Sequence, residues 1–174
     1  MSNTTTLLLR FLAAILLIAA TPGVSRVDAA NSLVLNPSDH IAIIGNNLAD
    51  RMQHHGWLET YLQAEFPQHR LTIRNLGFTG DEVKTRPRSA NFGNPDQWLA
   101  KVKADVVFCF FGYNEALRGP DGLPAFRKDL ADMLTGMKGQ KYNGKSAPRI
   151  VVFSPIGHEN LNSPHLPDGT KNNR

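Results

Sequence analysis

The sequence feature that most constrains the fold is the stretch His40–Asp50, in which a short apolar run stops at a glycine and a helical pattern begins at once. Ile41, Ile43 and Ile44 are β-branched, so the run predicts a strand that is buried on both faces of a sheet. Gly45 allows the backbone to turn sharply into the helix that follows. In α/β proteins ligands bind beyond the carboxyl ends of such strands, so this junction is the first candidate site.

The remainder of the chain alternates predicted helices with predicted strands. Apolar spacing predicts helices over 48–66, 95–103 and 123–138, and apolar runs predict strands over 71–75, 105–111 and 149–154. Gly56 is expected to kink or divide the first helix. Residues 76–94 form a loop rich in glycine, proline and asparagine, whose length is typical of functional or disordered segments. The order of elements predicts one α/β domain, with a parallel sheet covered by helices on both faces.

The N-terminus has the pattern of a secretory signal peptide. Arg10 precedes the apolar run Phe11–Ala20, a Thr-Pro-Gly break follows, and small residues precede a cleavage site near Ala29. A membrane anchor is the alternative, but a run of about ten residues is too short to span a bilayer. We therefore expect export to the periplasm or beyond. Residues 1–29 would be the signal peptide, 30–39 a linker and 40–174 the domain.

The net charge and the single cysteine argue against a nucleic-acid surface and against a disulfide. The formal net charge is +4, and it falls to +3 without the first 29 residues, which hold two arginines and one aspartate. Lys84, Arg86 and Arg88 are clustered without interleaved aromatic residues, so we expect a solvated loop rather than a nucleic-acid surface. Cys109 lies in an apolar run and has no second cysteine to pair with, which predicts a buried, unreactive thiol.

Three polar clusters follow the ends of successive strands. They are Gly45–Asn47, Asn75–Asp81 and Gly112–Glu115. In a parallel sheet these ends lie at one edge, so the clusters are expected to converge. Gly80 offers a backbone N–H that no Cβ obstructs, and Asn114 offers a side-chain N–H. Such donors near the start of a helix predict an oxyanion hole.

In order and strand context these clusters resemble the conserved blocks of SGNH (GDSL-type) hydrolases, which are flavodoxin-like ester hydrolases. The resemblance implies a three-layer α/β/α fold, with Asn46 and Asn47 at the positions of the aspartate and the nucleophilic serine of the first block. It also implies that Gly80 and Asn114 are the oxyanion donors. The stretches Arg51–Trp57 and Phe153–Glu159 are similar to a planctomycete-type exported branch, whose domains often open much longer proteins.

Two departures from that family predict an inactive domain. The amide of Asn47 is no nucleophile, whereas ester hydrolysis of this type needs a hydroxyl activated by a base. The Asp-x-x-His block is absent, as are the fifth strand and last helix that would carry it, and His165 does not have the aspartate three residues before it. Residues 150–153 would then form an unprotected edge strand, so we expect that the chain is incomplete or that another segment covers this edge.

Several interpretations stay open for single residues. The Gly45–Asn47 stretch is typical of a strand-to-helix turn with asparagine as the helix cap. Glu115 fits an acid–base group or, more commonly, a solvated loop carboxylate. The adjacent His54 and His55 point about 100° apart on a helix, which favours a surface role over a metal site. His158 and Glu159 follow the last strand and are placed to approach the pocket, although they form a weak ligand pair.

The resemblance thus implies a site for an acyl or acetyl ester, on a small molecule or a glycan, without metal or cofactor. Ligand contacts are expected from four further residues of the clusters: Asn46, Asp81, Tyr113 and Glu115. Two alternatives remain beside the degenerate hydrolase. One is a non-catalytic module that binds a carbohydrate or acyl ligand within a larger exported protein. The other is a fragment without function, from a split gene or an early stop.

Overall fold

The computed structural model describes residues 32–166, 169 and 173, and within them residues from Leu33 onward form one compact α/β unit. The sheet of this described part has the strands β1 (His40–Gly45), β2 (Thr72–Asn75), β3 (Val106–Phe110) and β4 (Arg149–Val152), all parallel, in the order β2-β1-β3-β4. Non-consecutive neighbours such as β1 and β3 require crossover connections, which the helices supply.

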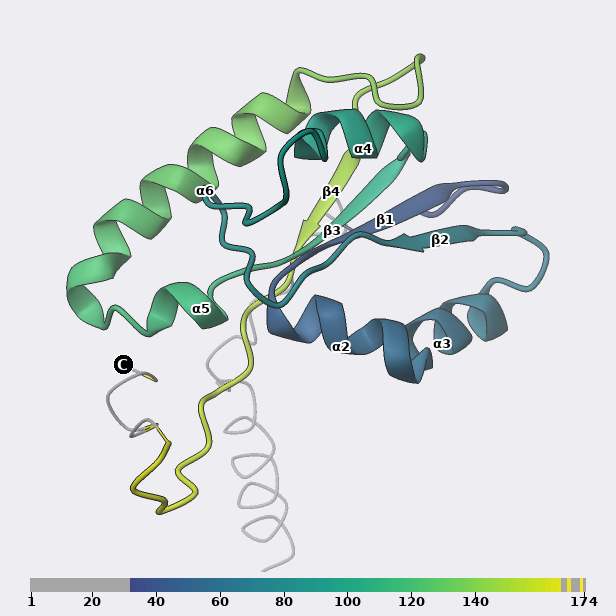
Figure 1. The fold of residues 1–174 in the computed structure, drawn as a ribbon. Coiled ribbons are helices and arrows are strands. Elements are labelled where there is room, and N and C mark those ends of the chain that lie inside the picture. Colours follow the sequence, from purple (N-terminus) through teal and green to yellow (C-terminus); the bar gives the residue numbers. More distant parts are fainter. Residues whose placement is uncertain (1–31, 167–168, 170–172, 174) are drawn as a thin grey trace, which may run out of the picture. The chain divides into compact units, whose positions relative to one another are not determined.

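Helices cover both faces of the sheet (Figure 1). On one face lie α2 (Asn47–His55) and α3 (Trp57–Glu65), and on the other lie α4 (Pro95–Lys101) and α6 (Leu123–Lys138). Ile41 and Ile43 pack toward α2 and α3, whereas Ala42 and Ile44 pack toward α4 and α6, because successive side chains of a strand point to opposite faces. The three-layer α/β/α fold expected from the sequence is thus confirmed.

The boundaries differ from the sequence-based ones mainly where short turns intervene. Gly56 divides the first helix into α2 and α3. Its φ of 57° lies in the left-handed region, the conformation in which glycine commonly terminates a helix. Two short elements were not predicted, α5 (Tyr113–Ala116) and the 3₁₀ turn Pro120–Gly122. Both follow β3 within a polar stretch, where four residues are too few to show a helical period.

The segment before β1 packs on the domain and does not behave as a free linker. Leu35 is buried in the core, and the buried carboxylate of Asp39 forms an ion pair with Arg149 of β4 at 2.6 Å. The compact unit therefore begins at Leu33 rather than at His40. The predicted signal peptide lies outside the described residues. No helix in the described part of the chain is long and apolar enough to cross a membrane.

Strand β4 lies at one edge of the sheet and, among residues 32–166, pairs with β3 alone. Its last residue, Val152, is 45% exposed, while Phe153 stacks on Phe110 with ring centroids 4.2 Å apart. Phe153 thus covers part of the apolar face of this edge, and among the described residues no second strand pairs with the β4 backbone, which is the edge strand expected from the sequence.

Candidate functional site

The polar loops after β1, β2 and β3 meet at one edge because of the strand register. Gly45 pairs with Phe110, and Ile43 pairs with Asn75, so the three strands end side by side. A Cβ on Gly45 would lie 2.2 Å from the Phe110 carbonyl oxygen, and its φ is +145°, so only glycine fits this contact. The Phe78 amide donates to the Gly45 carbonyl at 3.0 Å, which brings the loop after β2 against the end of β1.

Asn47, Gly80 and Asn114 come together at this edge, and we call these three residues the amide cluster. The Asn47 side-chain amide donates to the Asn114 side-chain oxygen at 3.4 Å. The Asn114 amide in turn donates to the carbonyl oxygens of Thr79 and Asp81 at 2.9 and 3.1 Å, on either side of Gly80. The convergence inferred from the strand ends is therefore present in the structure.

The donors of the amide cluster are unequally available. Both N–H groups of the Asn114 amide are used by backbone carbonyls, so this side chain has no hydrogen left for a ligand. In the described part of the chain Gly80 makes no hydrogen bond through its N–H, and the residue is exposed. The bond from Asn47 is long, at 3.4 Å, and therefore weak. The cluster as it stands offers the Gly80 backbone N–H as a free donor and holds no nucleophile.

The helix-cap interpretation of the Gly45–Asn47 stretch requires a correction. Asn46 is the residue before the first turn of α2, but its side chain makes no capping bond. It is 1% exposed and donates instead to the carboxylate of Glu115 at 3.2 Å. Asn47 is already the first residue of the helix. The buried acceptor on the neighbouring loop attracts the Asn46 amide away from the helix terminus.

Glu115 is buried, with 6% exposure, so the expectation of a solvated loop carboxylate was wrong. Its carboxylate accepts from the Asn46 side chain at 3.2 Å, from the Gly112 amide at 2.9 Å and from the Val83 amide at 2.8 Å. These donors come from three separate loops. Glu115 therefore ties the strand ends together, and its oxygens are occupied by protein donors.

Asp81 is also buried, and it is paired with both arginines of the following loop. Its carboxylate lies 2.6 and 2.9 Å from the guanidinium of Arg88 and 3.3 Å from that of Arg86. We call Asp81, Arg86 and Arg88 the ion cluster. The expectation that these two arginines are solvated was wrong, because their side chains are only 15% and 19% exposed, whereas Lys84 is 79% exposed.

Aromatic rings complete the surroundings of the two guanidinium groups. Arg86 lies 4.5 Å from the centroid of Phe111, and Arg88 lies 4.2 Å from that of Phe78, which are cation–π distances. Burial lowers the pKa of Arg86, and the neighbouring Asp81 opposes that shift. Phe78 belongs to the same loop as Arg88, whereas Phe111 directly follows β3 and is far from Arg86 along the chain, so the local sequence does not predict that contact.

The remaining candidates lie apart from the amide cluster or offer no ligand set. Tyr113 is stacked on His158, with ring centroids 4.1 Å apart, and the buried Nε2 atom of His158 makes no hydrogen bond to any described residue. His54 and His55 are exposed on α2. Among the residues described, no three histidine, cysteine, aspartate or glutamate side chains could hold a metal ion. Cys109 is fully buried, as expected, and burial raises the pKa of its thiol to about 12.

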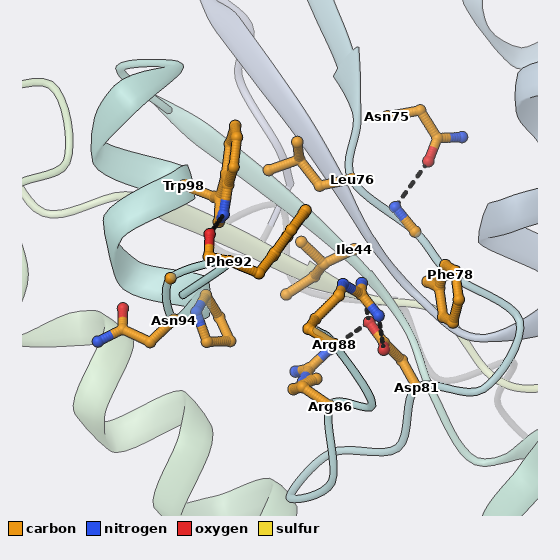
Figure 2. Close-up of a pocket in the computed structure, with 13 residues that line it drawn as sticks. Ile44, Asn75, Leu76, Phe78, Asp81, Arg86, Arg88, Phe92, Asn94 and Trp98 are labelled. Carbon is orange, nitrogen blue, oxygen red and sulfur yellow. Dashed lines mark hydrogen bonds and ion pairs between the residues drawn. The ribbon is translucent and has the colours of Figure 1, made fainter. Parts of the chain in front are cut away.

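Beside the ion cluster lies a cavity of about 240 Å³, which we call the loop pocket (Figure 2). It opens between the loop after β2 and the start of α4, and no motif in the sequence predicts it. Its lining consists of Ile44, Asn75, Leu76, Gly77, Phe78, Asp81, Arg86, Arg88, Phe92, Gly93, Asn94, Pro95 and Trp98. By contrast, the cavity next to Asn46 and Tyr113 holds only about 10 Å³, and one of about 640 Å³ lies beside Gly112 and His158.

Comparison with known proteins supports the fold. No protein-family model matches this sequence, and neither does any curated protein. Among solved structures, the fold is similar to that of a gut microbial diltiazem-metabolizing enzyme, with a TM-score of 0.52 and 18% sequence identity. The match covers 70% of this chain and 28% of that enzyme. The chain thus matches less than a third of the enzyme, and at this identity the likeness concerns the fold alone.

Proposed function

We propose that this chain contains an SGNH-hydrolase-like domain in which the ester-hydrolysing machinery is degenerate. One observation carries the proposal. At the end of β1, where the hydrolases that the sequence resembles have their serine, Asn47 donates a hydrogen bond to the side chain of Asn114. The position is thus filled by an amide that is held by a second amide. The fold shared with the diltiazem-metabolizing enzyme is compatible with this proposal.

The chemistry of the amide cluster explains the expected inactivity. An amide nitrogen is delocalised and does not attack an ester carbonyl, so no acyl-enzyme can form on Asn47. In serine hydrolases, removal of the nucleophile alone costs about a millionfold in turnover rate, and what remains comes from the oxyanion hole and binding. Here even the oxyanion hole is incomplete, because the Asn114 hydrogens are donated to the carbonyls of Thr79 and Asp81.

A second function, binding without turnover, is favoured by the donor that stays free. Gly80 follows Thr79, whose hydroxyl donates at 2.7 Å to Asp50 in the first turn of α2, and the N-terminal N–H groups of a helix favour a partially negative oxygen. An ester or acetyl carbonyl is such a group. In this version the domain is a module of a larger exported protein that holds an acylated small molecule or glycan. Export itself rests on the pattern of residues 1–29 and is tested by the mass of the secreted mature protein, which should begin near Ala30.

Ester hydrolysis is tested with purified protein and p-nitrophenyl acetate, together with a fluorophosphonate probe that labels activated serines. We expect the folded protein to release p-nitrophenol no faster than the same protein after heat unfolding, and we expect no covalent label. Saturable turnover of the folded protein, or stoichiometric labelling, would overturn the proposed loss of activity.

Binding is tested by calorimetry with an acetylated sugar and its deacetylated form. If the module version is right, the acetylated form binds more tightly, and Asn114→Ala weakens binding because the Gly80 loop is no longer held. Asn36→Ala is the matched control. Asn36 precedes β1, at the end of the sheet where the strands begin, so its substitution should leave the affinity unchanged. Equal affinity for both sugars, or no effect of Asn114→Ala, would contradict this version.

A further inference from the structure

The loop pocket has an apolar, planar part. Phe92 and Trp98 are stacked, with ring centroids 5.0 Å apart and planes inclined by 29°. Ile44 and Leu76 contribute aliphatic lining, and Phe78 and Phe92 are large rings that stay 45% and 44% exposed. Aromatic walls with exposed ring surface bind flat apolar groups, because burial of that surface is favourable.

The loop pocket also carries an excess positive charge. The only charged residues among its described lining are Asp81, Arg86 and Arg88, so two guanidinium groups face one carboxylate. All three side chains are mostly buried, and water therefore screens the remaining charge poorly. A buried charge without a partner is costly, so a site of this kind favours an anion that brings the missing negative charge.

One buried hydrogen-bond donor of the ion cluster is unused. The Nε atom of Arg86 is buried and makes no hydrogen bond to any residue that the structure describes. The other nitrogens of Arg86 contact Asp81, Val83 and Met133. Elsewhere in the lining the Trp98 indole N–H donates to the Phe92 carbonyl at 2.9 Å, and the Asn94 side-chain oxygen accepts from the Gln97 amide, so these two groups are satisfied within the protein. The unsatisfied polar group of the site is therefore a hydrogen-bond donor, and a ligand that satisfies it must supply an acceptor.

We propose that the loop pocket binds a small organic monocarboxylate with a flat apolar body, of the arenecarboxylate class. The carboxylate would neutralise the second guanidinium charge of the ion cluster and accept from Arg86, and the ring would pack against Phe92 and Trp98 (Figure 2). The volume of about 240 Å³ limits the ligand to roughly one ring with a short substituent. None of the three residues of the amide cluster lines this pocket, so the proposed ligand site does not depend on the proposed loss of ester chemistry.

The neighbouring cavity shows why the anion belongs in the loop pocket. Arg86 also lines that cavity, but its companions there include Asp96, Asp129 and Asp132, with Lys84 as the other cation. Three carboxylates against two cations repel an anion. The loop pocket has the opposite balance and the aromatic lining that the other cavity does not have.

The test compares benzoate with benzamide, which has nearly the same shape and no charge. Each is titrated into ¹⁵N-labelled protein, and the indole N–H signal of Trp98 is followed by NMR. The sequence has two tryptophans, so Trp57→Phe assigns the signals, and Trp57 is 66% exposed, which makes this change mild. We expect saturable shifts of the Trp98 signal with benzoate and at least about tenfold weaker binding of benzamide, as loss of one charge-assisted hydrogen bond predicts.

Arg86→Gln supplies the second arm. It leaves a balanced Asp81–Arg88 pair, so benzoate should bind about tenfold more weakly and lose its advantage over benzamide. Arg118→Gln is the matched control, because it removes one guanidinium from an exposed pair with Glu82 and should leave the affinity for benzoate unchanged. Circular dichroism verifies that both variants fold. If Arg86→Gln does not fold, the comparison of acid and amide on the parent protein decides.

Three outcomes would overturn the proposal. The first is equal affinity for benzoate and benzamide, which would make the pocket merely apolar. The second is no shift of the Trp98 signal up to about 10 mM benzoate, a concentration at which a fitted ligand of this size binds. The third is a loss of affinity in Arg118→Gln as large as in Arg86→Gln, which would indicate general charge attraction.

Discussion

The amide cluster and the ion cluster lie at the same edge of the sheet, and two consecutive residues, Gly80 and Asp81, belong to one each. The ion cluster is buried and held by contacts as short as 2.6 Å. The amide cluster is partly exposed, and its link between Asn47 and Asn114 measures 3.4 Å. The difference shows that the loop after β2 is anchored by the charges, while the Asn47 side chain is held weakly.

The energetic reason lies in desolvation. Removing one partner of a buried ion pair leaves a charge in a poorly solvated place, whereas breaking a long amide–amide contact at the surface lets water replace it. The two clusters should therefore respond very differently to substitution. The following predictions test that contrast, from the largest expected effect to the smallest, through the free energy of unfolding measured by urea titration.

The largest effect is expected from Asp81→Asn. This change keeps the shape of the side chain but leaves Arg86 and Arg88 without a counter-charge, so the free energy of unfolding should fall by about 3–5 kcal/mol. Glu82→Gln is the control next to it in the chain. Its partner Arg118 is 54% exposed, and loss of that surface pair should cost less than about 1 kcal/mol. Similar losses in the free energy of unfolding for Asp81→Asn and Glu82→Gln would contradict the proposed difference between buried and exposed charges.

A smaller loss is expected from Glu115→Gln. The amide has one oxygen and would place an N–H group where the carboxylate now accepts from the Asn46 side chain or the Gly112 and Val83 backbone, so about 2–3 kcal/mol should be lost. The control is Glu159→Gln at an exposed position, with an expected change within about 0.5 kcal/mol. An unchanged stability of Glu115→Gln would mean that this carboxylate does not hold the loops.

Asn114→Ala should cost about 1–2 kcal/mol, because the carbonyls of Thr79 and Asp81 lose their donor but can reach water. Amide hydrogen exchange of residues 79–82 should become faster, and this local change distinguishes loss of the loop contacts from global destabilisation. Slow exchange in this segment despite the substitution would show that the ion cluster alone holds it.

The smallest effect is expected from Asn47→Ser. Loss of the 3.4 Å contact should change the free energy of unfolding by no more than about 0.5 kcal/mol. The new hydroxyl should not hydrolyse p-nitrophenyl acetate, because among the described residues the side chain at position 47 is hydrogen-bonded to the Asn114 amide and to no base. If hydrolysis appears, the double variant Asn47→Ser, His158→Ala tests His158 as the base, since its buried Nε2 makes no hydrogen bond to a described residue and its ring is stacked on Tyr113.

The sequence determined the architecture because that information is local. β-branched apolar runs such as Ile41–Ile44 specify buried strands, and the helical period between them specifies which faces pack on the sheet. Parallel order then brings the strand ends together, which is why Asn47, Gly80 and Asn114 were expected at one edge and lie there. Gly45 is also part of the information that the local sequence carries. Its positive φ and its close contact with Phe110 both require a residue without a side chain.

Only the tertiary structure decided which polar groups are buried and how they pair. Asp81, Arg86, Arg88 and Glu115 have the loop sequence of solvated charges, yet all four are mostly buried. Some of their partners are neighbours in the chain, but Asn46 and Val83 beside Glu115 and Phe111 beside Arg86 come from segments more than twenty residues away. The cost of burying a charge depends on what surrounds it in space, and periodicity along a chain carries no information about that.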